Sequence, residues 1–203
     1  ISFVLSGFMR DNLIQNGWSK DKIKLLVPHQ DVPAVHPKPP TDIPQLLFVG
    51  QLIRGKGVDL LLRALAKLDR PFHCTIVGRG NDEAYLKDLA RHEGISDKIS
   101  FRGFTADIGE YYQQADMAIV PSRWQEPFGL VGLEAFAYQI PVIGFAVGGI
   151  TEWLKHKVNG LAVREGDTSR LARAIRILID DPAARKRYAA AGYALIQTRF
   201  TRT

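Results

Sequence analysis

Short apolar runs alternate along this chain with longer segments in which apolar and polar residues recur at helical spacing. Most of the runs are continuous, and a glycine or a proline follows within a few residues of each one. Continuous runs are typical of strands in a parallel sheet that helices cover on both faces. The pattern predicts such strands at residues 46–50, 72–78, 99–103, 117–121, 141–145 and 160–163.

The segments between these runs carry apolar residues at i, i+3 and i+4, which places them on one face of a helix. One such segment has its apolar residues at Leu171, Ile175, Leu178 and Ile179. A further helix is expected to start at Pro182, because proline suits the first helical turn. The alternation of strands and helices predicts an α/β fold with a doubly wound parallel sheet, whose ligands bind at the carboxyl ends of the strands.

The first part of the chain differs from this alternation. Residues 1–5 and 23–27 are expected as strands, with a helix at 7–17 between them. Residues 28–44 then hold six prolines in seventeen positions, which keeps the chain extended and predicts an interdomain linker. Ile1 is not an initiator residue, and we therefore expect this sequence to be the C-terminal part of a longer protein.

Composition narrows the class of protein. The 203 residues suffice for one domain of ordinary size plus a further segment, and the hydrophobic (46%) and charged (24%) contents are normal for a globular protein. No apolar run approaches the roughly 20 residues that a membrane-spanning helix needs. The one cysteine, Cys74, excludes an intrachain disulfide and fits a reducing compartment, so we expect a cytoplasmic protein.

The formal net charge of +6 is modest. Solubility explains this charge without a special partner, and we expect no nucleic-acid partner. Attraction to phosphate-bearing ligands or to an anionic membrane surface stays as an alternative, and it would place the protein peripherally at the inner face of the membrane.

The most informative segment for chemistry contains two glutamates eight positions apart. Glu126 and Glu134 bracket an apolar, glycine-containing stretch that runs into a predicted helix. The amides of Phe128, Gly129 and Leu130 would lie at the start of that helix, where free N–H groups and the helix dipole favour an anion. A ligand with hydroxyls at both ends and phosphates between them fits this layout, and a nucleotide-sugar is such a ligand.

Two other uses of these glutamates are weighed against this one. An acid/base pair of a glycosidase needs a defined separation, which one glutamate in a loop and one in a helix do not support. Glu134 could also be an ordinary exposed helix residue. Because Leu130, Leu133 and Ala137 surround it with an apolar pattern, we expect Glu134 to be buried and to need a partner.

The loop that begins at Gly50 resembles a phosphate loop. Its sequence, GQLIRGKG, nearly fits G-x-x-x-x-G-K-[ST], but Gly57 replaces the hydroxyl residue that would hold magnesium, which argues against a nucleoside triphosphatase. Arg54 and Lys56 remain as cations at a helix start, where they would suit a diphosphate. The later sequence VGRG lacks the third glycine of a dinucleotide motif, so a nicotinamide dehydrogenase is not favoured.

Two remaining features carry less information. The five histidines are scattered and no D-x-D pair is present, so no metal site is expected. Gly148 and Gly149 predict a turn after the strand at 141–145, either close to a ligand or without one.

Together these residues resemble the C-terminal, donor-binding domain of the group 1 glycosyltransferases of family 4, which have the GT-B fold and retain the anomeric configuration. The resemblance rests on FVGQLIRGKG, TIVGRG, ISFRGF, the E-x7-E segment, PVIGFAVGG and NGLAV, which occur in the family's order. It implies that residues 45–203 bind a nucleotide-sugar and that residues 28–44 are the interdomain linker. Residues 1–27 would be a remnant of the N-terminal, acceptor-binding domain, whose missing part is the expected partner.

The resemblance also implies roles for single residues. Glu134 would hold the ribose, and Glu126, as the catalytic carboxylate, would hold hydroxyls of the transferred sugar. Lys56 would bind the diphosphate together with the three amides at the helix start, without a metal ion or cofactor. The other residues implied in donor binding are Gly50, Gln51, Arg54, Gly78, Gly103 and Phe104.

One position departs from the family's pattern. The residue after the strand-ending glycine is usually arginine, and here it is Gln51, so Arg54 is the candidate to replace that phosphate contact. Two alternatives to a retaining glycosyltransferase stay open: a nucleotide-sugar epimerase of the same fold, and a non-catalytic sugar-nucleotide-binding module, which the departure at Gln51 makes possible. Product analysis separates transfer from epimerisation, and binding without turnover would favour the module. The base, the sugar and the acceptor are not determined by the sequence.

Overall fold

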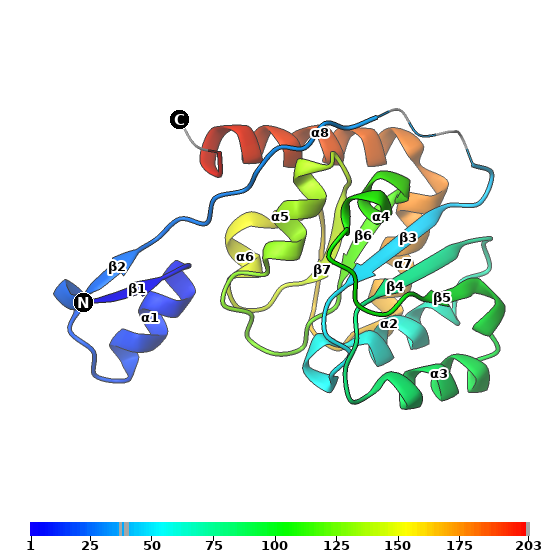
Figure 1. The fold of residues 1–203 in the computed structure, drawn as a ribbon, viewed down its shortest axis with the longest axis horizontal. Helices are drawn as coiled ribbons and strands as arrows, with labels where there is room; N and C mark the ends of the chain where they lie inside the picture. Colours follow the sequence, from blue (N-terminus) through cyan, green and yellow to red (C-terminus); the bar gives the residue numbers. More distant parts are fainter. Residues whose placement is uncertain (37, 39–40, 202–203) are drawn as a thin grey trace.

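Helices cover both faces of one parallel sheet in the computed structural model, which describes residues 1–36, 38 and 41–201 (Figure 1). The strand order is β5-β4-β3-β6-β7-β8, and every neighbouring pair is parallel. The predicted α/β fold with a doubly wound parallel sheet is confirmed. Its strands are β3 (Gln45–Val49), β4 (His73–Val77), β5 (Ile99–Phe101), β6 (Met117–Val120), β7 (Val142–Phe145) and β8 (Gly160–Val163).

The helices form two layers around this sheet. On one face α2 packs against α3 and α7, and on the other face lie α4 and α5, with α8 packed on α5 (Figure 1). Asp181 separates the last two helices, and its Oδ1 accepts a hydrogen bond from the Ala184 amide at 2.8 Å. The helices are α2 (Val58–Leu65), α3 (Glu83–His92), α4 (Gly109–Gln114), α5 (Leu130–Ala137), α6 (Ile150–Trp153), α7 (Thr168–Asp180) and α8 (Pro182–Arg199).

The first 25 residues form a small unit of their own beside the sheet (Figure 1). It contains β1 (Ser2–Val4), α1 (Gly7–Gln15) and β2 (Ile23–Leu25), and the two strands are parallel. The strand–helix–strand order predicted for this part of the chain is therefore confirmed. Short 3-10 helices lie at Lys20–Lys22, Arg54–Lys56 and Ser96–Lys98.

The proline-rich segment passes along α8 to reach β3 (Figure 1). Its described residues form neither helix nor strand. The amide of Gln30 donates to the Phe200 carbonyl at 2.7 Å, and Lys38 Nζ lies 2.6 Å from Asp116 Oδ1. Three of its six prolines, Pro37, Pro39 and Pro40, lie outside the described residues.

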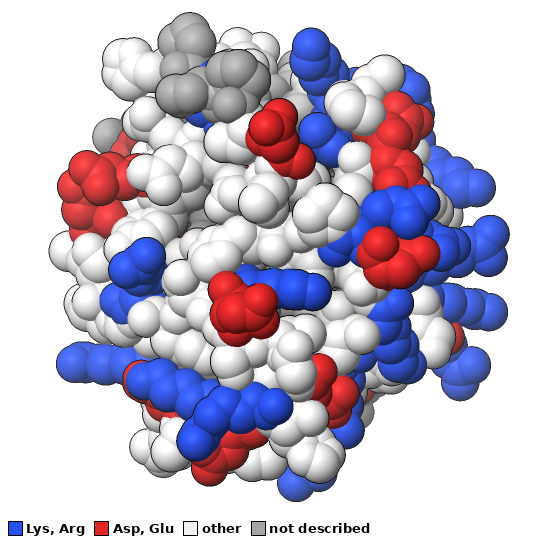
Figure 2. All heavy atoms as spheres, turned by 90° about the vertical axis from the view of Figure 1, so that its right-hand side faces the viewer, with Lys and Arg blue, Asp and Glu red and all other residues white. Residues whose placement is uncertain are grey.

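Charged side chains of both signs share the surface seen in Figure 2, although Lys and Arg outnumber Asp and Glu on one side of that view. Several of the basic side chains have partners. Arg70 Nε lies 2.9 Å from Asp180 Oδ1, and Lys67 Nζ donates to Thr168 and Ser169 at 2.9 Å each. Within the described residues, no helix is both long enough and apolar enough to cross a membrane.

Close packing of α8 on α5 depends on a residue without a side chain. A Cβ atom built at Gly192 of α8 would lie 2.3 Å from Phe136 Cδ1. Phe136 is fully buried and cannot move away freely, because its ring packs edge-on against Trp153 with 5.6 Å between the ring centroids. Gly192 thus lets α8 approach α5.

Gly192→Ala should destabilise the fold by about 1–3 kcal/mol, because the added methyl group overpacks the contact with Phe136. In an exposed helix the same change would stabilise by about 1 kcal/mol, so the sign of the effect is diagnostic. Ala190→Gly, at an exposed position of α8, is the control and should cost about 1 kcal/mol from helix propensity alone. Urea unfolding measures all three proteins, and a higher midpoint for Gly192→Ala would contradict the packing argument.

Candidate functional site

The strand order reverses direction between β3 and β6. From β3 the chain proceeds outward to β4 and β5, and it then returns to add β6 on the other side of β3. Loops that leave two neighbouring strands in opposite directions open a crevice at their carboxyl ends, and ligands of doubly wound sheets bind in that crevice. The loops after β3 and β6 therefore frame the candidate site.

These two loops are joined through their backbones. The Gly55 carbonyl accepts hydrogen bonds from the amides of Arg123 at 2.9 Å and Trp124 at 3.3 Å. Gly57, with φ of +70°, begins α2, and a Cβ atom there would lie 1.9 Å from the Pro121 carbonyl oxygen. Only glycine fits this close approach.

A buried charge cluster lies where the loops meet. Lys56 Nζ, from the first loop, donates to Glu126 Oε1 at 2.6 Å, and Ser122 Oγ donates to the same oxygen at 2.6 Å. Glu126 is only 5% exposed and Ser122 only 2%. Lys56 Nζ also lies 4.9 Å from the centre of the Trp124 ring, a favourable position for a cation. The structure thus unites Lys56 and Glu126, which the sequence analysis assigns to different parts of a ligand.

The hydrogen bonds in this cluster keep Glu126 ionised. Burial alone would raise the pKa of the Glu126 carboxyl, but the hydrogen bonds from Lys56 and Ser122 outweigh it and hold the pKa below its ordinary value. A buried carboxylate without such partners would be costly. Glu126 is therefore an anion held in place by neighbours that a ligand would have to replace.

The backbone of the Glu126 loop is fixed from the other side by the turn after β7. The amide of Gly149 donates to the Glu126 carbonyl at 2.8 Å, and the amide of Gly148 donates to Gln125 Oε1 at 3.0 Å. A Cβ atom at Gly148 would lie 2.4 Å from the Glu126 carbonyl oxygen. Gly148 and Gly149 therefore approach the protein's own loop closely, and not a ligand, and in this way they position Glu126.

The start of α5 presents its backbone amides. Gly129, in the left-handed conformation with φ of +81°, begins the helix, and the Phe128 carbonyl accepts a hydrogen bond from Trp153 Nε1 at 2.6 Å. Among the described residues, no acceptor pairs with the amides of Phe128, Gly129 or Leu130. The predicted crowding of free donors at this helix start is therefore present. The Phe128 side chain is buried, so only its backbone is available.

Glu134 lies further along α5 and has a phenol as its partner. Tyr112 Oη donates to Glu134 Oε2 at 2.8 Å, and the Tyr112 ring stacks on Tyr138 with 5.1 Å between the centroids. Burial, followed by the charge of Glu134, raises the pKa of Tyr112 well above its ordinary value. The phenol therefore keeps its proton and orients one oxygen of the Glu134 carboxylate.

The burial of Glu134 differs from what the sequence pattern predicts. Glu134 is only partly buried, and Leu130, expected in the buried stripe around it, is 43% exposed. Glu126 in the loop is the buried carboxylate. The prediction that Glu134 is buried was wrong, because Glu134 shares its side of α5 with the exposed Leu130, four residues earlier, while Leu133 and Ala137 are fully buried.

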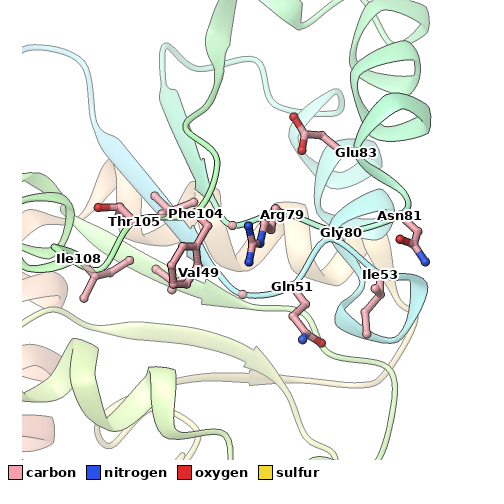
Figure 3. Close-up of a pocket in the computed structure, with 13 residues that line it drawn as sticks. Val49, Gln51, Ile53, Arg79, Gly80, Asn81, Glu83, Phe104, Thr105 and Ile108 are labelled. Carbon is pink, nitrogen blue, oxygen red and sulfur yellow. The ribbon is translucent and has the colours of Figure 1, made fainter.

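A cavity of about 860 Å³ opens at the carboxyl ends of β3 and β4 (Figure 3). Four predicted site residues line it, namely Gly50, Gln51, Gly78 and Phe104. Lys56, Glu126 and Glu134 are not among the lining residues. The cavity and the charge cluster are therefore two separate parts of the candidate site at the carboxyl ends of the strands. Phe104 is 68% exposed, and the Arg79 guanidinium lies 5.1 Å from the centre of its ring.

Two glycines bring the backbones of β3 and β4 together at the floor of this cavity. A Cβ atom at Gly78, with φ of +144°, would lie 1.8 Å from the Gly50 carbonyl oxygen. The Gly78 amide donates to the Gly103 carbonyl at 2.7 Å, which also ties the end of β5 to this edge. The loop glycines thus keep side chains out of the space that a ligand would occupy.

Arg54 does not join either part of the site. It is exposed and lines a separate hollow of about 360 Å³ together with Asp82 and Tyr85. The predicted replacement of the missing arginine by Arg54 therefore has no support in this arrangement. Within the described part of the chain, no three His, Cys, Asp or Glu side chains gather as metal ligands would.

Several residues that shape the site are not among those predicted from the sequence. Ser122 and Tyr112 hold the two glutamates, and Arg79, Asn81 and Thr105 line the cavity. Position offers a signal for some of them: Arg79 and Asn81 follow the carboxyl end of β4, and Thr105 follows Phe104. Ser122 could have been found from its place four residues before Glu126, whereas no local pattern indicates Tyr112, whose partner Glu134 lies 22 residues further along the chain.

Lys56→Met should raise the pKa of Glu126, because it removes one of the hydrogen bonds that offset the effect of burial. In the native chain, the depressed pKa makes Glu126 stabilising above its unfolded-state pKa of about 4.3, and this stability is lost as the pH falls through the folded-state value. In the variant that loss should begin at higher pH. Carboxyl-carbon NMR follows the titration directly.

Lys87→Met is the matched control, since Lys87 pairs with Glu83 on the surface at 2.7 Å and should not affect Glu126. An unchanged Glu126 titration in Lys56→Met would mean that the ion pair is absent in solution.

Comparison with known proteins identifies the family of this chain. The profile of the family described as "Glycosyl transferases group 1" matches residues 33–195. An uncharacterised glycosyltransferase of Methanocaldococcus jannaschii is 36% identical over 144 residues, which are 69% of this chain and 37% of that protein. Glycogen synthase of Mycobacterium tuberculosis is 36% identical over 159 residues, 76% of this chain and 38% of that protein. The chain thus spans less than two fifths of the length of these relatives.

Solved structures agree with this result. The Anabaena protein HepE in complex with UDP-glucose superposes with a TM-score of 0.91 at 25% identity, over 98% of this chain and 59% of that one. Sequence and fold therefore give the same answer: the chain belongs to the group 1 glycosyl transferases.

Proposed function

We propose that this chain is the donor-binding part of a retaining glycosyltransferase of family 4, which transfers a sugar from a nucleoside diphosphate sugar to an acceptor hydroxyl. The observation that carries the proposal is the meeting of Lys56 and Glu126 across the crevice between β3 and β6, beside an open cavity. Lys56 and the free amides at the start of α5 would match the diphosphate of such a donor, and Glu126 would match its sugar.

The nucleoside would occupy the cavity at the ends of β3 and β4. Its volume of about 860 Å³ is ample for a base and a ribose, and Phe104 with Arg79 offers flat faces for a base. Glu134, oriented by Tyr112, would accept hydrogen bonds from the ribose hydroxyls. The HepE structures, which hold UDP and UDP-glucose, support a nucleotide-sugar of this type.

The diphosphate would lie between the cavity and the charge cluster. The free amides at the start of α5 and the Lys56 ammonium would face it, and the dipole of α5 adds to the positive potential there. Gln51 is exposed beside the cavity and carries no charge, so Lys56 is the main cation on this path. Lys56 would exchange Glu126 for a phosphate when the donor binds.

The transferred sugar would then reach Glu126. Because Lys56 has turned to the diphosphate, the Glu126 carboxylate would be free to accept hydrogen bonds from sugar hydroxyls. As the bond between sugar and diphosphate breaks, the diphosphate gains negative charge, which Lys56 and the α5 amides would stabilise by roughly 3–4 kcal/mol per donor group. Positive charge develops on the sugar, and the nearby Glu126 carboxylate would orient the sugar and lower that cost.

The remaining parts of the enzyme follow from the family. Residues 45–203 would form the donor domain, residues 28–44 the linker and residues 1–27 the end of an N-terminal domain that binds the acceptor. Acceptor-binding groups would then come from outside this chain, so the chain by itself would bind the donor without turnover. A cytoplasmic location, with association at the inner face of the membrane, remains a prediction.

A non-catalytic sugar-nucleotide-binding module is the second candidate, and the uncharged Gln51 is the observation in its favour. It shares the donor site with the first candidate but would show no transfer in the full-length protein. The two therefore differ in turnover and not in binding.

Glu134→Ala should weaken the binding of UDP and UDP-glucose alike, by roughly 1–3 kcal/mol, because both ligands carry the ribose. Glu126→Ala should weaken the binding of UDP-glucose and leave the binding of UDP unchanged or tighter. In this variant Lys56 no longer has to leave a carboxylate before it can bind the diphosphate. Isothermal titration calorimetry of each variant with both ligands measures the four affinities.

Glu165→Ala, at an exposed position after β8, serves as the control for the loss of one negative charge. Circular dichroism of each variant checks that the fold is kept. Equal losses of UDP affinity in Glu126→Ala and Glu134→Ala would refute the separate roles of the two glutamates.

Removal of divalent metal ions should leave UDP affinity within about twofold of its value with magnesium, because Lys56 and the α5 amides supply the positive potential. The measurement is a calorimetric titration with UDP in EDTA and in magnesium chloride, at equal ionic strength. Loss of binding in EDTA from a chain that stays folded would show that the site needs a metal ion.

A further inference from the structure

The amino end of α1 touches the loop that carries Glu126. Ser6 begins this helix, and its hydroxyl accepts a hydrogen bond from the Met9 amide at 3.1 Å while donating to the Pro127 carbonyl at 2.5 Å. Ser6 is fully buried by these contacts, with 0% exposure. One side chain thus caps a helix of the N-terminal unit and holds the backbone of the candidate site, 121 residues away in sequence.

A second contact joins the same helix end to α6. The Phe8 amide donates to Glu152 Oε1 at 2.8 Å. The first turn of α1 contains no acidic residue of its own, so Glu152 supplies the negative charge that the amino end of a helix favours. Arg10 on α1 forms its ion pair with Asp11, Nε to Oδ1 at 2.8 Å, so the contact of Glu152 with α1 is the hydrogen bond to the Phe8 amide.

Both contacts of α1, at Pro127 and at Glu152, lie next to segments that hold Glu126. Pro127 is the next residue after Glu126, and α6 begins immediately after Gly149, whose amide donates to the Glu126 carbonyl. The backbone of Glu126 is thus held between α1 on one side and the turn before α6 on the other. Any movement of α1 relative to the sheet would therefore disturb both the contact at Pro127 and the contact at Glu152.

We propose that Ser6 and Glu152 form a docking contact through which the N-terminal unit sets the position of Glu126. They are positioning residues, since neither lies where the sugar or the phosphates are placed. The inference rests on the proposed function for its consequence, which is that the sugar end of the donor site is complete only when α1 is docked. The nucleoside end, formed by β3, β4 and Glu134, does not depend on this contact.

The first test needs no ligand. Ser6→Ala and Glu152→Ala in the 203-residue chain should each raise hydrogen exchange at the Gly148 and Gly149 amides, which donate to Gln125 and to the Glu126 carbonyl, by roughly 3- to 10-fold for the loss of one such hydrogen bond. Each should also shift the carboxyl titration of Glu126. Glu152→Gln keeps an oxygen that can accept from Phe8 and should restore part of the protection.

Ser19→Ala is the matched control, because Ser19 precedes a 3-10 helix of the same unit without forming a side-chain cap. It should leave all these readouts unchanged. If Ser6→Ala acts but Glu152→Ala does not, the effect is fraying of α1, and the proposed docking contact is wrong. Unchanged exchange in both variants would overturn it as well.

The second test separates this inference from the proposed function. With UDP and UDP-glucose as probes, both variants should keep UDP affinity and lose UDP-glucose affinity by roughly 3- to 10-fold. Suppose that hydrogen exchange at Gly148 and Gly149 rises in both variants, but that Glu126→Ala does not change UDP-glucose binding. The docking contact would then stand, and the proposed role of Glu126 would be refuted. Equal loss of both ligands would show that the contact serves the fold and not the position of Glu126.

Discussion

The site depends on the backbone contact between the loops after β3 and β6. Two amides of the second loop share the Gly55 carbonyl, and Gly57 lets the first loop approach Pro121 to a distance that no side chain would permit. This contact brings Lys56 and Glu126 within hydrogen-bonding distance, and a small displacement of either loop would separate them. The glycines therefore act on the chemistry indirectly, through the spacing of two charged side chains from different strands.

The partly buried ion pair of Lys56 and Glu126 has a particular energetic role in the candidate site. Glu126 and Lys56 neutralise each other while the site is empty, so neither charge is left unpaired in a region of low exposure. A ligand with phosphates at one end and hydroxyls at the other can satisfy both partners separately. A ligand with only one of these ends would leave the other partner unpaired, so under the proposed function the pair would favour complete donors over fragments.

The strands and most helices could be predicted from the sequence, because continuous apolar runs and helical spacing are local properties. Lys56, Glu126 and Phe104 could be placed at the site from motif and position. The burial of Glu126 could not, because it depends on Lys56, which lies 70 residues away in the sequence and reaches Glu126 only in the folded chain. Leu130, apolar in sequence, was expected inside, but it begins α5 and is 43% exposed.

The separation of the two loops along the chain has a consequence for folding. Lys56 and Glu126 are 70 residues apart, and β4 and β5 lie between β3 and β6 in the sequence. Closing so long a loop costs chain entropy that local pairings do not, so β6 is expected to join a sheet that β3, β4 and β5 have already begun. Until then one edge of β3 stays open at the centre of the future domain. A chaperone that shields this edge would protect the chain at its most aggregation-prone stage.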